Sequence, residues 1–237
     1  MRSFELSPRL QSLADLVPQG AVLTDVGTDH AFLPVWLLLQ GRISRAIAAD
    51  LHEGPLENAR KTADHCAVAD RISFRLCDGL SGIAAEETDC IAIAGMGGET
   101  IAEILQAAAW TAEGQHRFLL QPMTGHAELR TWLSRNGFSI AAEQLTREGR
   151  SIYLTLLVKA GDMVPLTPGE TWGGRQSAEM VSPLRSRYLA RLIIRADKAV
   201  LGAEQSSKPE DALRADGLRA IAAGLKDLKK EWDAWQA

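Results

Sequence analysis

Acidic or glycine-rich turns follow four consecutive apolar runs in the first hundred residues. The first turn is TDVGTDH at 24–30, and the later ones contain Asp50, the pair Asp78 and Gly79, and GMGG at 95–98. If each apolar run is a parallel strand, these turns gather at the sheet edge where open α/β folds bind ligands. Carboxylates at that edge suit a ligand with cationic and hydrogen-bond donor groups, whereas two aspartates in one turn disfavour a phosphate.

S-adenosylmethionine has these properties, because it lacks phosphates, carries a sulfonium and an ammonium, and presents hydroxyl and amine donors. We expect Gly27 to let the backbone approach the methionine part, and Asp25 to bind the amino group directly or through water. Asp50 lies 23 residues after Gly27, close to the offset of about 20 at which an acidic residue meets the ribose in nucleotide-binding folds. Asp78 would face the adenine amine. Taken singly, each aspartate could instead cap a helix.

The elements that would position these turns are short apolar runs alternating with amphipathic stretches, which is typical of β-α units around a mostly parallel sheet. Strands are predicted at 21–26, 46–49, 72–76, 90–94, 117–121, 138–144 and 152–158, and helices before the first strand and near 31–40, 55–67, 99–109 and 125–135. Only TREGR separates the last two strands, so they must form an antiparallel hairpin. This α/β layout predicts the seven-stranded, Rossmann-like sheet of a class I methyltransferase. A doubly wound dehydrogenase would more often keep its sixth strand parallel.

The chain changes character after residue 160. The stretch AGDMVPLTPGETWGG indicates a linker, and two helices are predicted after it. The second helix has the seam spacing of a coiled coil at Leu218, Ile221, Leu225, Leu228, Trp232 and Trp235. Its partner is predicted at about 180–201, joined through GAEQSSKPED as an antiparallel hairpin. We therefore expect an S-adenosylmethionine-binding catalytic domain over 1–160, and a linker with a helical coiled-coil domain over 161–237.

Several runs between residue 6 and about residue 135 resemble one family. LSPRL, TDVGTDHAFLP, DLHEGPLENAR, RLCDGL, IAGMGGETI and LQPMTGHAELRTWL are similar to the TrmK family of bacterial tRNA methyltransferases. Members of that family transfer a methyl group from S-adenosylmethionine to N1 of adenine 22 in the D-arm of tRNA, and they carry a coiled-coil C-terminal domain. The resemblance implies the same activity and cofactor here, with tRNA as the partner.

The resemblance also implies roles for individual residues. The cofactor-binding positions of the family fall on Asp25, Gly27, Asp50, Asp78 and Gly79. Its glycine turn replaces the Asn-Pro-Pro-Tyr loop of amino-methylating enzymes, and it places Gly95 and Met96 at the cofactor and Gly97 and Gly98 where a flat base needs space. Met96 could instead simply fill apolar space. Ring N1 already offers a lone pair, so the enzyme mainly has to position the ring.

Asp29 is the candidate catalytic residue, because it lies two residues past Gly27, where the chain turns toward the pocket. Its carboxylate would assist the loss of a proton from the amine of the methylated adenine. The alternative is that Asp29 caps the following helix. His30 could be a general base, but a hydrogen bond within the turn is the favoured interpretation.

Recognition of tRNA needs positive charge, and the net charge of the chain is −4. Residues 1–160 carry 14 Lys and Arg against 19 Asp and Glu, and residues 161–237 carry 12 against 11. On the predicted helix the basic side chains share one face and are expected to bind phosphates: Arg187, Arg191, Arg195 and Lys198, with Arg185 nearby. A solvated helix surface is the alternative. Arg9 is expected to line the mouth of the cofactor or substrate site.

Other features narrow the class of protein. Cys66, Cys77 and Cys90 form no C-x-x-C pair, so neither a disulfide framework nor a metal site is expected. The longest apolar run, at 31–39, is too short to cross a bilayer, and we expect a cytoplasmic protein without a membrane or obligate protein partner. Two alternatives are a noncatalytic RNA-binding or scaffold protein with this fold, and a nicotinamide-dependent oxidoreductase. The second is disfavoured, because Thr28, Asp29 and Ala31 occupy positions where a pyrophosphate turn needs glycine.

Overall fold

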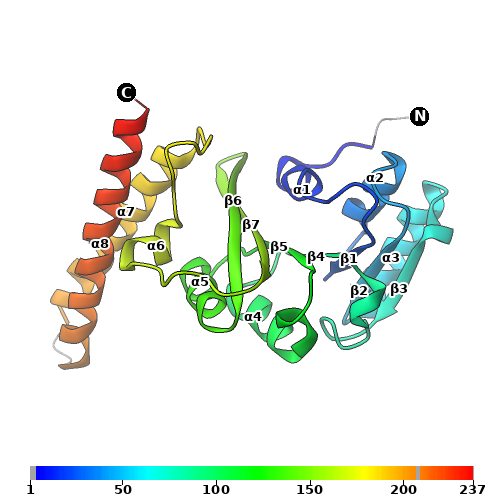
Figure 1. Ribbon diagram of the computed structural model, residues 1–237, viewed down its shortest axis with the longest axis horizontal. Helices are drawn as coiled ribbons and strands as arrows, with labels where there is room; N and C mark the ends of the chain where they lie inside the picture. The colour runs from blue at the N-terminus through cyan, green and yellow to red at the C-terminus, as the bar shows by residue number, and fades with distance from the viewer. Residues whose placement is uncertain (1–3, 207–208, 237) are drawn as a thin grey trace.

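A seven-stranded sheet forms the centre of the computed structural model, which describes residues 4–206 and 209–236 (Figure 1). The strands are β1 Leu23–Val26, β2 Ala46–Asp50, β3 Ile72–Leu76, β4 Cys90–Ala94, β5 Arg117–Gln121, β6 Phe138–Glu148 and β7 Ser151–Ala160. Their order is β3-β2-β1-β4-β5-β7-β6, with β1 to β5 parallel and β7 antiparallel between β5 and β6. The predicted methyltransferase-type sheet is confirmed.

Five helices cover the two faces of this sheet. They are α1 Pro8–Ala14, α2 Phe32–Leu39, α3 Glu53–His65, α4 Gly98–Ala107 and α5 His126–Arg135, with short 3-10 turns at Ala69–Arg71, Ala85–Glu87 and Ala109–Ala112. The side chains of α1, α2 and α3 pack on one face of the sheet, whereas those of α4 and α5 pack on the other. Successive strand residues such as Ile91 and Ala92 belong to opposite cores, as the two-residue period of a strand requires. Both faces are therefore buried, which explains the continuous apolar runs in the sequence.

The C-terminal segment forms a hairpin of two long helices, α7 Arg185–Glu204 and α8 Pro209–Trp235. The helices are antiparallel, because Arg219 and Lys226 of α8 pair with Glu204 and Asp197 of α7, so later residues of one helix meet earlier residues of the other. Leu225 and Trp232 are buried in the seam as expected, but Trp235 is 37% exposed. The predicted connection GAEQSSKPED includes residues 207 and 208, which lie outside the described residues.

The predicted linker contains one short helix, α6 Pro168–Gly173, that the sequence analysis missed. Its N-terminus is a capping box in which the hydroxyl of Thr167 accepts from the backbone N–H of Glu170, and the Glu170 carboxylate accepts from that of Thr167. The helix packs against both α5 and α8, so the segment after β7 fixes the helical hairpin to the sheet domain. The division of the chain near residue 160 stays a prediction.

A buried ion pair holds α6 from the side of the sheet domain. The guanidinium of Arg130 on α5 is fully buried and donates to both carboxylate oxygens of Glu143 on β6, at 2.8 and 2.6 Å. It also donates to the carbonyls of Thr171 and Trp172 at 3.2 and 2.9 Å. Burial alone would lower the pKa of Arg130, but the Glu143 carboxylate more than offsets this and raises it. Arg130 thus supplies donors that carbonyls at the end of α6 lack within the helix.

Arg185 holds the same helix end from the side of the hairpin, and this corrects one prediction. Its side chain is 1% exposed, and it donates to the carbonyls of Gly173 and Gly174 at 2.5 and 2.8 Å. Arg185 therefore does not belong to an exposed RNA-binding face. The helix begins at Arg185 rather than near Met180, which turns this first residue inward onto α6.

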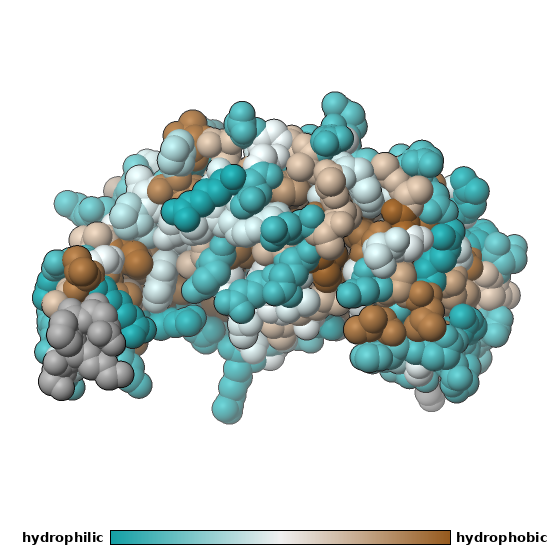
Figure 2. All heavy atoms as spheres, turned by 90° about the horizontal axis from the view of Figure 1, so that it is seen from below, coloured by the Kyte–Doolittle hydropathy of each residue, from teal (hydrophilic) through white to brown (hydrophobic). Residues whose placement is uncertain are grey.

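Figure 2 shows hydrophilic side chains over much of the face seen from below, with hydrophobic ones gathered toward the end formed by β1 to β3. Within residues 4–206 and 209–236, no helix is long and apolar enough to cross a membrane. In the same part of the chain, no group of three or more His, Cys, Asp or Glu side chains is placed to hold a metal ion.

Candidate active site

A cleft of about 470 Å³ lies beyond the carboxyl ends of β1 to β4. Its lining includes most of the predicted cofactor residues, namely Gly27, Asp50, Asp78, Gly79 and Met96. They meet because the strand ends are level: Val26 of β1 pairs with Ala49 of β2 and with Ile93 of β4. The volume lies within the roughly 300–1,000 Å³ of typical small-molecule sites.

Gly27 adopts a conformation that only glycine takes without strain, with φ at +75°. Its N–H and that of Thr28 both donate to the carbonyl of Ala49, at 2.8 and 3.1 Å, which holds the turn against β2. A Cβ on Gly27 would collide with the methyl group of Met96. The Met96 methyl group thus rests directly against Gly27, and any side chain at position 27 would have to displace Met96, which also lines the cleft.

Asp25 has the most perturbed carboxyl in this region. Burial raises its pKa to about 6, the hydroxyl of Thr28 and the charge of Arg9 oppose the shift, and the charge of Asp50 adds to it. At neutral pH the carboxylate is ionised at an energetic cost, since burial disfavours the charged form. A cationic group of a ligand would relieve that cost.

Asp50 and Asp78 follow β2 and β3 but differ in their surroundings. Asp50 Oδ1 accepts from the backbone N–H of His52 at 2.8 Å, which orients its side chain without capping α3. Asp78 is exposed, and Gly79 after it has φ at +54°. A Cβ on Gly79 would approach Ile104 of α4 to 3.0 Å, so the chain here passes close to that helix.

The GMGG turn is packed against the loop that follows β5. Met96 O accepts from the N–H of Met123, and Gly98 N–H donates to the carbonyl of Thr124, both at 2.8 Å. A Cβ on Gly98 would overlap the carbonyl of Gly125. Gly98 is therefore required for the packing of two loops, which corrects the expectation that it leaves space for a base. Open space occurs at Gly95 instead, where φ is +81° and no atom lies within 4 Å of a Cβ position.

Arg9 is not among the residues that line the cleft, but a polar network that the sequence did not predict holds it nearby, and its role at the mouth of the site stays a prediction. Its Nη1 donates to Gln121 Oε1 at 3.3 Å. The Gln121 amide is fully buried and donates to Arg9 O at 3.0 Å and to Thr155 Oγ1 at 2.9 Å. Arg9 N–H donates to Glu148 Oε2 at 3.0 Å. A buried amide thus fixes Arg9 above the end of β5, where its charge acts on Asp25. The only sequence signal was a polar residue that ends an apolar strand.

Asp29 and His30 lie at the rim. The Asp29 side chain is 70% exposed, and His30 Nε2 lies 3.4 Å from its Oδ2. The ring of His30 stacks on Phe32, with centroids 4.9 Å apart. The cap of α2 is Ala31, with no side-chain hydrogen bond, so the alternative that Asp29 caps this helix is wrong. Its catalytic role stays a prediction.

The other four residues of the predicted basic face are exposed on α7: Arg187, Arg191, Arg195 and Lys198. Two of them face other parts of the molecule: Arg191 contacts the turn after β6, and Arg195 lines a small cavity with Trp172 of α6 and the residues that begin α5. Arg191 Nη2 donates to the carbonyl of Arg150 at 3.3 Å, and the Arg195 guanidinium lies 5.5 Å from the ring centre of Trp172. This basic face therefore borders the catalytic edge of the sheet, and its contact with RNA stays a prediction.

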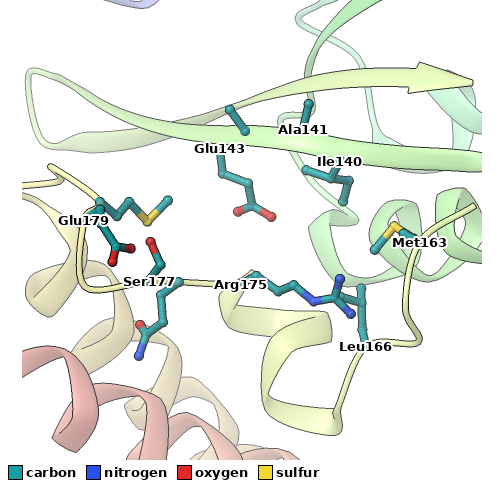
Figure 3. Close-up of a pocket in the computed structure, with 11 residues that line it drawn as sticks. Ile140, Ala141, Glu143, Met163, Leu166, Arg175, Ser177 and Glu179 are labelled. Atoms are coloured by element: carbon teal, nitrogen blue, oxygen red, sulfur yellow. The ribbon is translucent and has the colours of Figure 1, made fainter. Parts of the chain in front are cut away.

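A second cavity, of about 430 Å³, lies between β6 and the linker (Figure 3). Figure 3 shows Glu143, Arg175 and Glu179 around it together with apolar side chains such as Met163. None of the predicted cofactor residues lines this cavity, and Glu143 is already paired with Arg130. The cleft at the strand ends is therefore the candidate active site.

Comparison with known proteins supports the assignment of this cleft as the active site. Residues 6–156 match the family described as "Methyltransferase domain", so the sheet and its cleft define a methyltransferase. Over 162 residues, or 68% of each chain, the protein is 38% identical to the tRNA (adenine(22)-N(1))-methyltransferase of Bacillus subtilis strain 168. The chain belongs to the TrmK family of tRNA methyltransferases.

Solved structures support the same assignment over nearly the whole chain. The crystal structure of B. subtilis TrmK matches with a TM-score of 0.85 and 29% identity, covering 96% of this chain and 100% of that one. The Streptococcus pneumoniae protein Sp1610, in complex with S-adenosyl-L-methionine, matches with a TM-score of 0.79 and 35% identity, covering 93% and 100%. The likeness therefore includes the helical hairpin as well as the sheet domain.

Proposed function

We propose that the protein transfers a methyl group from S-adenosylmethionine to N1 of adenine 22 in the D-arm of tRNA, and that it does so in the cytoplasm. The observation that carries this proposal is the cleft at the ends of β1 to β4, with Asp50 and Asp78 in its lining and Gly27 and Met96 in contact at its wall. Support comes from the B. subtilis relative, which is named for this reaction, and from the S. pneumoniae structure, which contains the cofactor.

The residues of the cleft fit the parts of this cofactor. The Asp25 carboxylate is not among the side chains that line the cleft, but it is close enough to Asp50 to feel its charge, and it would bind the ammonium group, directly or through water. Asp50, already oriented by the N–H of His52, would accept hydrogen bonds from the ribose hydroxyls. Asp78 and Gly79, at the other end of the cleft, would border the adenine. When bound, S-adenosylmethionine supplies a methyl group activated by its sulfonium charge.

The protein then has to place ring N1 of the target adenine in line with that methyl group. The open side of Gly95, with Met96 and the exposed side chain of Met123, offers space for a flat base next to the cleft. The lone pair of N1 would form the bond to the methyl carbon while the bond from that carbon to sulfur breaks, so the positive charge would pass from the sulfur to the base. Asp29, exposed at the rim, would accept a proton from the exocyclic amine of the methylated base.

Binding of the tRNA needs contacts beyond the cleft. N1 is the Watson–Crick acceptor of adenine, so a paired or stacked target base must be exposed before it can react. The α7 face formed by Arg187, Arg191, Arg195 and Lys198 would hold phosphates while this happens. Its position beside the catalytic edge of the sheet supports this role.

Incubation with labelled S-adenosylmethionine and unmodified tRNA transcripts tests the proposal. A transcript with adenine 22 should accept the label, and one with guanine at that position should not. Equal labelling of both transcripts would remove the assignment to position 22. Binding of the cofactor without methyl transfer to any of the tRNAs would favour the noncatalytic RNA-binding alternative.

A further inference from the structure

The turn between β6 and β7 stands at the catalytic edge of the molecule. Glu148 pairs with Ser151, so Gly149 and Arg150 alone form the turn. Because β7 is antiparallel to both β5 and β6, the end of β6 points in the same direction as the ends of the parallel strands. Figure 1 shows the hairpin extending beyond the neighbouring strands, between α1 and the helical hairpin.

Two hydrogen bonds connect this turn with the proposed sites on either side. Glu148 Oε2 accepts from the backbone N–H of Arg9, whose guanidinium lies above the end of β5. On the other side, the carbonyl of Arg150 accepts from Arg191 on the basic face of α7. The turn therefore joins the α7 face to Arg9, whose charge acts on Asp25.

The acidic and the basic side chains of the turn have different surroundings. Hydrogen bonding to the Arg9 N–H lowers the pKa of Glu148, so its carboxylate is ionised and engaged toward α1. Arg147 and Arg150 are exposed, and Arg147 uses only its Nε in a bond to the carbonyl of Gly149. Within the described part of the chain, no carboxylate lies within ion-pair distance of either guanidinium. Both side chains can therefore bind an external anion.

We propose that Arg147 and Arg150 form an RNA-binding element that contacts the sugar-phosphate backbone of the substrate tRNA next to the target nucleotide. Guanidinium groups match phosphate oxygens in charge and in geometry. The pair continues the basic face of α7 toward Arg9, on residues 1–160, which carry 14 basic residues, this pair included, against 19 acidic ones. This inference rests on the proposed function, because it takes the substrate to be tRNA.

The test compares the double variant Arg147→Gln/Arg150→Gln with Arg45→Gln/Arg135→Gln. The control removes the same charge from two exposed arginines at the opposite edge of the sheet, before β2 and at the end of α5. The affinity for unmodified tRNA is measured over a range of salt concentrations, with the affinity for S-adenosylmethionine as a check on folding. The hydrogen bond from Arg191 should persist, because it ends on the backbone of Arg150.

We expect the turn variant to bind tRNA about tenfold more weakly than the control, with a slope of log affinity against log salt that is smaller by roughly 1 to 2. Arg147→Lys/Arg150→Lys should restore most of that slope, because it keeps the charge. If the wild-type enzyme methylates tRNA but the turn variant binds tRNA as tightly as the control does, the inference is wrong and the proposed function still holds. Failure of the wild type itself to bind or methylate tRNA would instead overturn the proposed function.

Discussion

Replacement of Asp25 by asparagine should stabilise the protein while it weakens the cofactor site. Burial raises the pKa of this carboxyl from 3.8 to about 6, so the folded state holds the proton more tightly than the unfolded state does. Ionisation of Asp25 therefore costs nothing below about pH 3.8, and the cost grows as the pH rises toward 6. At pH 7 it amounts to roughly 3 kcal/mol, because each unit of pKa corresponds to about 1.4 kcal/mol.

Asp25→Asn should therefore gain up to about 3 kcal/mol in the free energy of unfolding at pH 7 and less than about 1 kcal/mol at pH 4. Urea unfolding of the cofactor-free protein at both pH values measures this difference. Asp29→Asn is the matched control, because it changes an exposed carboxylate in the same turn. A variant no more stable than the wild type at pH 7 would refute the burial argument.

The same carboxyl should make cofactor binding depend on pH. If the ammonium group binds the ionised Asp25, the wild-type affinity rises about tenfold between pH 5 and pH 7, because most molecules are protonated at pH 5. Asp25→Asn should bind S-adenosylmethionine more weakly and with little pH dependence, whereas Asp29→Asn should retain the wild-type profile. Calorimetric titrations at several pH values check this, and a flat wild-type profile would contradict the role of Asp25.

Two further substitutions test the cleft and the domain junction. Gly27→Ala should lower the affinity for S-adenosylmethionine at least tenfold in calorimetric titration, because the new methyl group displaces the Met96 side chain in the lining of the cleft. The control Gly41→Ala, with φ at +63° but open surroundings, shares only the backbone strain of about 1 to 2 kcal/mol. Equal affinities of the two variants would count against the cleft. Glu143→Gln should lower the free energy of unfolding by about 3 to 5 kcal/mol, because it leaves the buried charge of Arg130 uncompensated. Thermal unfolding measures this loss, with Glu53→Gln as the control, because it removes an exposed ion-pair partner and should lower the free energy of unfolding much less. Similar losses of stability in both variants would contradict the importance of burial.

The sheet and most of the cleft could be predicted from the sequence because both depend on local patterns. A strand buried on both faces is a continuous apolar run with a sharp end, and the carboxyl ends of parallel strands meet at one edge. Gly27, Asp50 and Asp78 could therefore be placed together from the sequence, whereas the role of Asp25 stays a prediction. The hairpin of β6 and β7 followed from the short connection between them.

The errors concern features that depend on tertiary contacts. The helix α6 is only six residues long, and its capping box lies in a segment whose prolines and glycines indicated a linker. Arg185 has the right spacing for the basic face, but its side chain turns inward to the carbonyls at the end of α6. Gly98 lies in a glycine-rich segment that indicated an open turn, yet the backbone of Gly125 occupies the space next to it. Side-chain direction at a helix end and the approach of two loops leave no periodic signal in a sequence.

The most direct test of the account is to locate the methyl group on the tRNA. After incubation with the wild-type enzyme and S-adenosylmethionine, nucleoside mass spectrometry and reverse transcription are applied to the same unmodified transcript. We expect 1-methyladenosine as the product and an arrest of reverse transcription at position 22, because a methyl group on N1 removes the Watson–Crick acceptor. Methylation of the exocyclic amine, or an arrest at another position, would contradict the central claim.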